Sequence, residues 1–196
     1  MKNEDLGNIH IDGDVFLKSP KLIKLLNFDD YDCIVQCLEN KGIFGGDQNP
    51  IWRDNAGLFS TCKYPSWANR ECDYMYNCGV IGFNNEELKR EYFDTYENMV
   101  KQYAQTGIDI PGTIPDIIIE QQFLKDLTDA RKYNVKCLLP VDNHESMHSY
   151  ATSIGYQHVI GGSKRRNLGK CLQAIKDFDK RIYRKLMNIK TELNIE

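Results

Sequence analysis

The stretch NIHIDGDVFLKSP, residues 8–20, places two aspartates one residue apart at the end of a short apolar run. Read as a strand, it puts His10, Asp12 and Asp14 on one face and the two isoleucines on the other, because side chains alternate along a strand. Two carboxylates that point the same way repel each other unless a cation or a basic group lies nearby. The stretch therefore predicts a divalent-cation site; the alternative is a solvated Asp-Gly-Asp turn.

The composition is that of one globular domain over residues 1–196, with 41% hydrophobic and 27% charged residues. A formal net charge of −3 gives no whole-molecule reason to expect nucleic-acid binding. No apolar run approaches the ~20 residues of a membrane span. The first residues, MKNEDLGN, lack the basic and apolar regions of a signal peptide. We therefore expect a cytoplasmic protein that does not bind nucleic acid.

The seven cysteines are an odd number and are spread widely along the chain. Without an export signal, this pattern indicates reduced thiols. Cys33 and Cys37 have a spacing that zinc ligands use, but no second pair accompanies them, so burial in the core is the favoured interpretation.

Hydrophobic periodicity and turn residues predict alternating strands and helices, which is typical of an α/β domain. One helix is well defined at both ends, because Asn85 can cap it and Gly107 can terminate it. A long irregular region rich in Gly, Asn, Pro and Trp is expected over 40–70. Strands are predicted over 8–17, 73–83, 135–139 and 156–161, and helices from Pro20 and over 85–107, 116–133 and about 167–193.

The segment from His158 to Lys164 combines groups that suit a diphosphate. An imidazole ends a predicted strand, Gly161 and Gly162 allow the backbone to approach a ligand, and a lysine follows. The alternative interpretation is a strand followed by a basic loop.

Three polar residues stand in apolar surroundings. Glu120 and Gln121 lie in the middle of an apolar helix, and Asn77 lies in the middle of an apolar strand. Polar groups in such places need partners. Those partners are either the hydroxyl groups of a substrate or neighbouring backbone.

An HExxH pattern occurs at His144, Glu145 and His148. On a helix, this pattern would place both imidazoles on one face to bind zinc, with the glutamate as general base of a zinc hydrolase. Pro140 lies just upstream and Gly155 just downstream, so a polar surface turn is the favoured interpretation.

Taken in order, five short motifs within residues 9–166 resemble the GT-A-fold glycosyltransferases, most nearly the glycogenin and galactosyltransferase-like type (family 8). The family pattern is Asp-x-Asp, Asn-Ala-Gly-Val, Asp-Gln, Leu-Pro and His-x-x-Gly-x-x-Lys. The matching residues here are Asp12-Gly13-Asp14, Asn77-Cys78-Gly79-Val80, Glu120-Gln121, Leu139-Pro140 and His158-x-x-Gly161-x-x-Lys164.

The resemblance implies a GT-A-like mixed sheet with flanking helices. It implies transfer of a sugar from a nucleotide-diphosphate donor, such as a UDP-sugar, to a glycan or another hydroxyl acceptor. Metal ligation of Mn²⁺ (or Mg²⁺) would fall to Asp12, Asp14 and His158. The diphosphate would contact Lys164 and the backbone of Gly161 and Gly162, and the catalytic groups near the transferred sugar would be Asn77, Glu120 and Gln121.

Two features depart from the family pattern. Glu120 replaces the usual aspartate, and Arg165-Arg166 replace a Pro-Trp pair. In addition, only 11 residues precede Asp12, so most of the N-terminal nucleotide-binding half is expected to be absent. The sheet would then have an unprotected edge open to self-association. A truncated or non-catalytic remnant that acts as a binding module is the alternative function.

The C-terminal helix is basic. Residues 163–190 hold 10 Lys and Arg against two aspartates. Its apolar stripe is expected to pack on the domain, and the alternative is peripheral contact with an anionic membrane surface.

Overall fold

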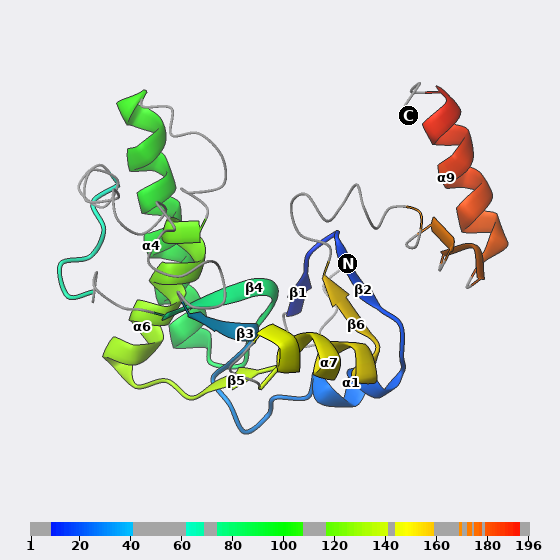
Figure 1. The fold of residues 1–196 in the computed structure, drawn as a ribbon. Helices are drawn as coiled ribbons and strands as arrows, with labels where there is room; N and C mark the ends of the chain where they lie inside the picture. Colours follow the sequence, from blue (N-terminus) through cyan, green and yellow to red (C-terminus); the bar gives the residue numbers. More distant parts are fainter. Residues whose placement is uncertain are drawn as a thin grey trace. The chain divides into compact units, whose positions relative to one another are not determined.

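The computed structural model describes residues 9–40, 62–68, 74–107, 117–140, 144–158 and, near the C-terminus, 169, 172–173, 175–177 and 179–192. The chain divides into two compact units, 1–157 and 158–196 (Figure 1). The elements are β1 (Ile9–Ile11), β2 (Val15–Leu17), α1 (Lys21–Leu25), β3 (Cys33–Asn40), β4 (Tyr74–Phe83), α4 (Glu86–Thr106), η2 (Ile117–Gln122), α6 (Phe123–Arg131), β5 (Val135–Cys137), α7 (His144–Ile154), β6 (Tyr156–His158) and α9 (Lys180–Glu192).

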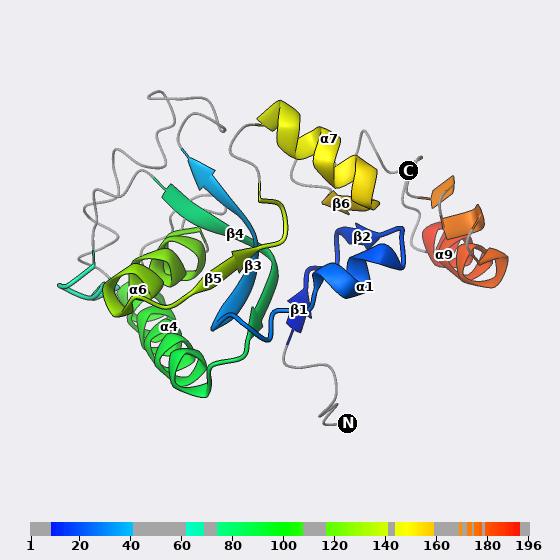
Figure 2. The ribbon, with the colours of Figure 1, turned by 90° about the horizontal axis from the view of Figure 1, so that it is seen from below.

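Four strands form a mixed sheet in the order β1-β4-β3-β5. Strand β4 runs antiparallel to both of its neighbours, whereas β5 runs parallel to β3. Figure 2 shows α4 and α6 on one side of this sheet and α1 and α7 on the other. The predicted α/β class, with a mixed sheet and flanking helices, is confirmed at this level. Strand β1 lies at one edge of the sheet.

Two apolar cores hold the helices on the sheet. The larger core joins β3 and β4 to α4, η2 and α6, with Phe123 and Leu127 fully buried in it. The smaller core joins Leu22 of α1, Cys37 and Val80, with α7 packed against it through Met147 and Ile154. At about 25 cal/mol per Å² of apolar surface removed from water, such cores supply the main force that holds the helices to the sheet.

Strand β3 was not predicted from the sequence. It is the second strand from one edge, with neighbours on both sides, and Cys33, Ile34, Val35 and Cys37 are completely buried. A strand that is buried on both faces lacks the alternation that reveals a strand. Burial of both cysteines confirms the favoured interpretation. It raises the pKa of the Cys33 thiol to about 12, which opposes the thiolate form that zinc needs.

The helix predicted over 85–107 is confirmed with its caps. The Asn85 side chain accepts hydrogen bonds from the backbone N–H groups of Glu87 and Leu88, and Gly107 ends α4 at φ 64°. The helix predicted over 116–133 is present from Ile117 but begins with a π-helical turn, η2, before α6. π-Helical turns are frequent at functional sites.

Two local predictions are wrong. The strand predicted over 8–17 is interrupted at Asp12-Gly13-Asp14, where the N–H of Val15 donates to the carbonyl of Asp12 and closes a turn. The polar turn predicted around residues 144–148 is the helix α7, because Pro140 and Gly155 flank the helix instead of breaking it. Gly155 ends α7 at φ 77°.

The C-terminal region is described in part. Residues 172–173 and 175–177 are helical, and Asp179 then interrupts the predicted helix by accepting hydrogen bonds from the backbone N–H groups of Arg181 and Ile182. This cap begins α9. Most of the irregular region predicted over 40–70 lies outside the described residues. None of the described helices is both long enough and apolar enough to cross a membrane.

Gly155→Ala is expected to destabilise the fold by about 2–5 kcal/mol, which combines the cost of a left-handed conformation with that of overpacking. A Cβ atom at Gly155 would lie 2.8 Å from Cβ of Ser19 in addition to the strain of φ +77°. Gly107→Ala is the matched control, because φ is +64° there and nothing lies within 4 Å of the added atom. The control should lose only about 1–2 kcal/mol in urea unfolding. Equal losses in the two variants would contradict the close packing of Gly155 on Ser19.

Candidate metal centre

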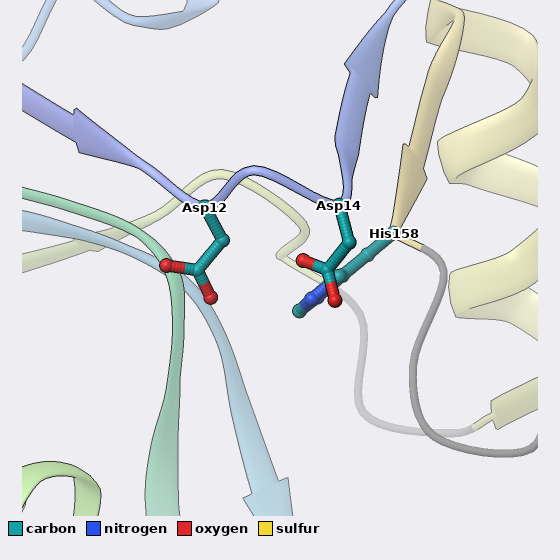
Figure 3. A group of neighbouring side chains, drawn as sticks. All are labelled: Asp12, Asp14 and His158. Carbon is teal, nitrogen blue, oxygen red and sulfur yellow. The ribbon is translucent and has the colours of Figure 1, made fainter. Parts of the chain in front are cut away.

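Asp12, Asp14 and His158 form a group of side chains that could hold a metal ion. One ligand atom from each residue lies within 4.8 Å of the others, and all three residues are partly buried. Figure 3 shows both carboxylates on the same side of the turn between β1 and β2, with the imidazole of His158 reaching toward Asp14 from the end of β6. The three residues that the resemblance implies as metal ligands are therefore close together in space.

Backbone pairing explains how residues so far apart in the sequence meet. The N–H of Asp12 donates to the carbonyl of Gly79 at 3.0 Å, which holds the first aspartate against β4. Strand β2 leaves the large sheet and pairs with β6 in a separate two-stranded sheet. The N–H of Lys18 donates to the carbonyl of Gly155 at 2.7 Å, and its ammonium group donates to the side chain of Gln157. The Asp-Gly-Asp turn is thus fixed at both ends.

The donor set matches a hard or borderline divalent cation. Carboxylate oxygens suit Mg²⁺ and Mn²⁺, and an imidazole extends the range toward Zn²⁺. Octahedral coordination at ~2.1 Å places adjacent ligand atoms about 3 Å apart, so an ion would draw the three side chains slightly together. Three protein ligands would leave about three octahedral positions for substrate oxygens or water.

His10 lies beside this group but does not belong to it. Its Nε2 atom is 3.0 Å from Oδ1 of Asp12, and its side chain is 69% exposed. This contact agrees with the expectation that His10 and Asp12 share a face. His10 therefore serves as a control for His158, because it contacts Asp12 but is not one of the three candidate ligands.

Asn77 makes its hydrogen bonds within the protein. Its Nδ2 atom donates to Oε1 of Glu39 at 2.6 Å, and its Oδ1 atom accepts the backbone N–H of Gly79 at 3.0 Å. The carbonyl of the same Gly79 accepts the N–H of Asp12. Hydrogen bonds therefore run from the Glu39 carboxyl group through Asn77 and Gly79 to the backbone of Asp12. Asn77 positions the turn, whereas the sequence had also allowed contact with a substrate.

Glu39 is the residue of this region that sequence reasoning missed. It lies on β3, is 4% exposed, and its burial raises the pKa of the carboxyl group to about 7, while the hydrogen bond from Asn77 lowers it. Only the position of β3 beside β4, which pairs Cys37 with Asn77, brings Glu39 to this place. Glu39 could have been found from the sequence only by predicting that β3 is a strand and that it pairs with β4.

Glu120 and Gln121 lie on η2 and are half-buried. The Cys78 thiol lies on β4, the strand on which η2 packs. Burial raises the pKa of this thiol, and the negative charges of Glu120, Glu39 and Asp12 raise it further. Asp12 follows β1 directly and is held against β4 by its hydrogen bond to Gly79, and Glu120 lies on η2, which packs on β4.

The remaining candidates are only partly described. Gly161, Gly162 and Lys164 lie outside the described residues. The backbone of His144 and Glu145 is helical, but their side chains also lie outside the description, whereas His148 is exposed. The diphosphate and zinc-hydrolase interpretations of these residues stay predictions.

The fold and the site together define an α/β protein with a candidate divalent-cation centre at the junction of two sheets. The chain belongs to a family of unknown function (DUF6734), whose model matches residues 2–188. No curated protein and no solved structure was found to match the chain.

Proposed function

We propose that this protein is a metal-dependent glycosyltransferase of GT-A-like fold, which transfers a sugar from a nucleotide-diphosphate donor to a hydroxyl acceptor. The observation that carries the proposal is the convergence of Asp12, Asp14 and His158. The resemblance implied these three residues as ligands of one ion, and their ligand atoms do lie together although His158 is remote from the aspartates in sequence.

The arrangement of the other motifs supports the same proposal. Strand β1 ends just before Asp12 and pairs antiparallel with β4, so that Ile11 lies opposite Val80 of the Asn77-Cys78-Gly79-Val80 motif. Glu120 and Gln121 lie on η2, which packs on β4. Three motifs that are weak separately, those of Asp12, Asn77 and Glu120, therefore lie along β4, as a common site requires.

In this proposal, Asp12, Asp14 and His158 would hold Mn²⁺ or Mg²⁺, which would neutralise charge on the departing diphosphate. Glu120 and Gln121 would contact the transferred sugar or the acceptor hydroxyl. Asn77 would act as a positioning residue, because its amide already bonds Glu39 and Gly79. Lys164 and the backbone of Gly161 and Gly162 would contact the diphosphate in the segment that follows β6.

One observation favours a second candidate, a binding module that keeps the ion but has lost catalysis. The side chain of Asn77 is used inside the protein at both its donor and its acceptor atoms. One of the three residues expected beside the sugar therefore has its hydrogen bonds directed elsewhere. Self-association through the edge strand β1 would fit either function.

The direct test is calorimetric titration of the full chain with a panel of UDP-sugars, with and without Mn²⁺. We expect nucleotide-sugar binding only when Mn²⁺ is present, and its loss in Asp12→Asn. Asp30→Asn is the control. Asp30 is an exposed aspartate in the segment between α1 and β3, and it belongs to no candidate metal-ligating group among the described side chains.

Two other outcomes would overturn the transferase proposal. Mn²⁺ binding without any nucleotide-sugar binding would favour the binding module. Stoichiometric zinc that is lost in His148→Ala but retained in Asp14→Asn would favour the zinc hydrolase.

A further inference from the structure

The helix α9 exposes a continuous apolar face. Ile182, Leu186 and Ile189 follow one another at the i, i+4 and i+7 spacing that places residues on one side of a helix. Their exposed fractions are 47%, 36% and 49%. Among the described residues, no other element exposes three large hydrophobic side chains. Such a face is costly in water unless something covers it.

Basic side chains cover the rest of this helix. Lys180, Arg181, Arg184 and Lys185 are all exposed. Within the α9 sequence, five Lys and Arg accompany a single glutamate. Arg181 is paired with the capping carboxylate of Asp179 at 3.1 Å, so the other three described cations are the ones available for an external anion. The helix therefore presents apolar and cationic groups together.

This charge pattern selects the kind of partner. A second copy of α9 would bring an equal number of positive charges to the same contact, and like charges repel. A surface that carries many anionic headgroups above an apolar layer would match both features at once. A helix of 13 residues is far too short to span a bilayer but suits a position in its interface.

We propose that α9 binds an anionic lipid membrane by lying in the plane of its surface. Ile182, Leu186 and Ile189 enter the boundary between headgroups and acyl chains, while the lysines and arginines contact the headgroups. This binding is independent of the proposed transferase activity, because no residue of the candidate metal centre takes part in it.

The test is co-sedimentation of the full chain with phosphatidylcholine vesicles, with and without about one-third phosphatidylserine. We expect binding only to the anionic vesicles and a loss of binding at high salt. Leu186→Glu is expected to weaken binding by about tenfold or more, since it removes an apolar contact and adds a negative charge.

Asn188→Glu is the matched control. It adds the same charge to the same helix. At ~100° per residue, position 188 lies about 240° around the helix from Ile182, and therefore on the polar face. It should weaken binding by only about twofold to fivefold, through charge alone. Circular dichroism of both variants checks that α9 remains folded.

Three results would overturn the proposal. The first is that the unmodified protein fails to bind anionic vesicles. The second is concentration-dependent dimerisation in analytical ultracentrifugation that Leu186→Glu abolishes, which would assign the apolar face to a second copy. The third is a large drop in thermal stability in Leu186→Glu but not in Asn188→Glu, which would show that the face packs within the chain.

Discussion

His158→Ala is expected to weaken Mn²⁺ binding by at least about 100-fold, because loss of an outer-shell partner alone costs about 10- to 100-fold and this change removes a ligand. His158 supplies the only nitrogen donor of the group that Asp12 and Asp14 complete. The measurement is calorimetric titration of the full chain with Mn²⁺. Asp14→Asn should give a comparable loss, since the carboxamide carries no charge.

His10→Ala is the control for this prediction. His10 lies 3.0 Å from Oδ1 of Asp12 and is the more exposed of the two partners, but it does not belong to the ligand group. Its removal should change Mn²⁺ affinity by no more than about threefold, because it removes a neighbour of Asp12 and not a ligand. If both histidine variants lose affinity equally, the ion lies on the β1 side of the turn and the assigned ligand set is wrong.

Glu39→Gln is expected to make the protein more stable at pH 8 by up to about 3 kcal/mol, with little effect at pH 5. Burial raises the pKa of Glu39 from 4.5 to about 7. Between these values the folded protein holds a proton that the unfolded chain releases. The free energy of unfolding therefore falls as the pH rises through this range. Glutamine cannot ionise, yet its side-chain oxygen can still accept the hydrogen bond from Asn77.

Urea unfolding of the protein and the variant at several pH values measures this difference. Asp126→Asn provides the comparison, because burial raises the pKa of Asp126 only from 3.8 to about 6, and its effect should appear at lower pH. Tyr64 and Gln122 donate to the Asp126 carboxylate, and these hydrogen bonds lower its pKa against the effect of burial, as Asn77 does for Glu39. A pH profile that is unchanged by Glu39→Gln would show that Glu39 ionises normally in the folded state.

Local signals in the sequence were enough to predict α4. Asn85 and Gly107 mark the ends of the helix within its own sequence, and the structure places the caps at these residues. Strand β4 was equally clear, as an apolar run of the right length. Elements of this kind need no knowledge of what they pack against.

Strand β3 could not be predicted in the same way. Gln36 and Glu39 interrupt its apolar pattern, and each is buried because a distant residue bonds it: Tyr156 donates to Gln36 at 2.5 Å, and Asn77 donates to Glu39. A polar residue whose partner is remote in sequence resembles a surface residue when only its neighbours are considered.

The candidate site lies between these two cases. The Asp-Gly-Asp stretch indicated a cation from its residues alone, but nothing in the stretch indicated His158. Its inclusion came from the order of motifs along the chain, and its position depends on the pairing of β2 with β6. The sequence predicted one strand over 8–17 with an Asp-Gly-Asp turn as the alternative, and the structure breaks the strand at these residues.

The break between β1 and β2 makes the aspartate turn the connection between two sheets. Asp12 follows the edge strand of the larger sheet, whereas Asp14 precedes β2 and His158 ends β6 in the smaller one. An ion bound by all three residues would link the two sheets to each other. Binding of the ion would then raise the free energy of unfolding, because the ion would bind the folded protein and not the unfolded chain.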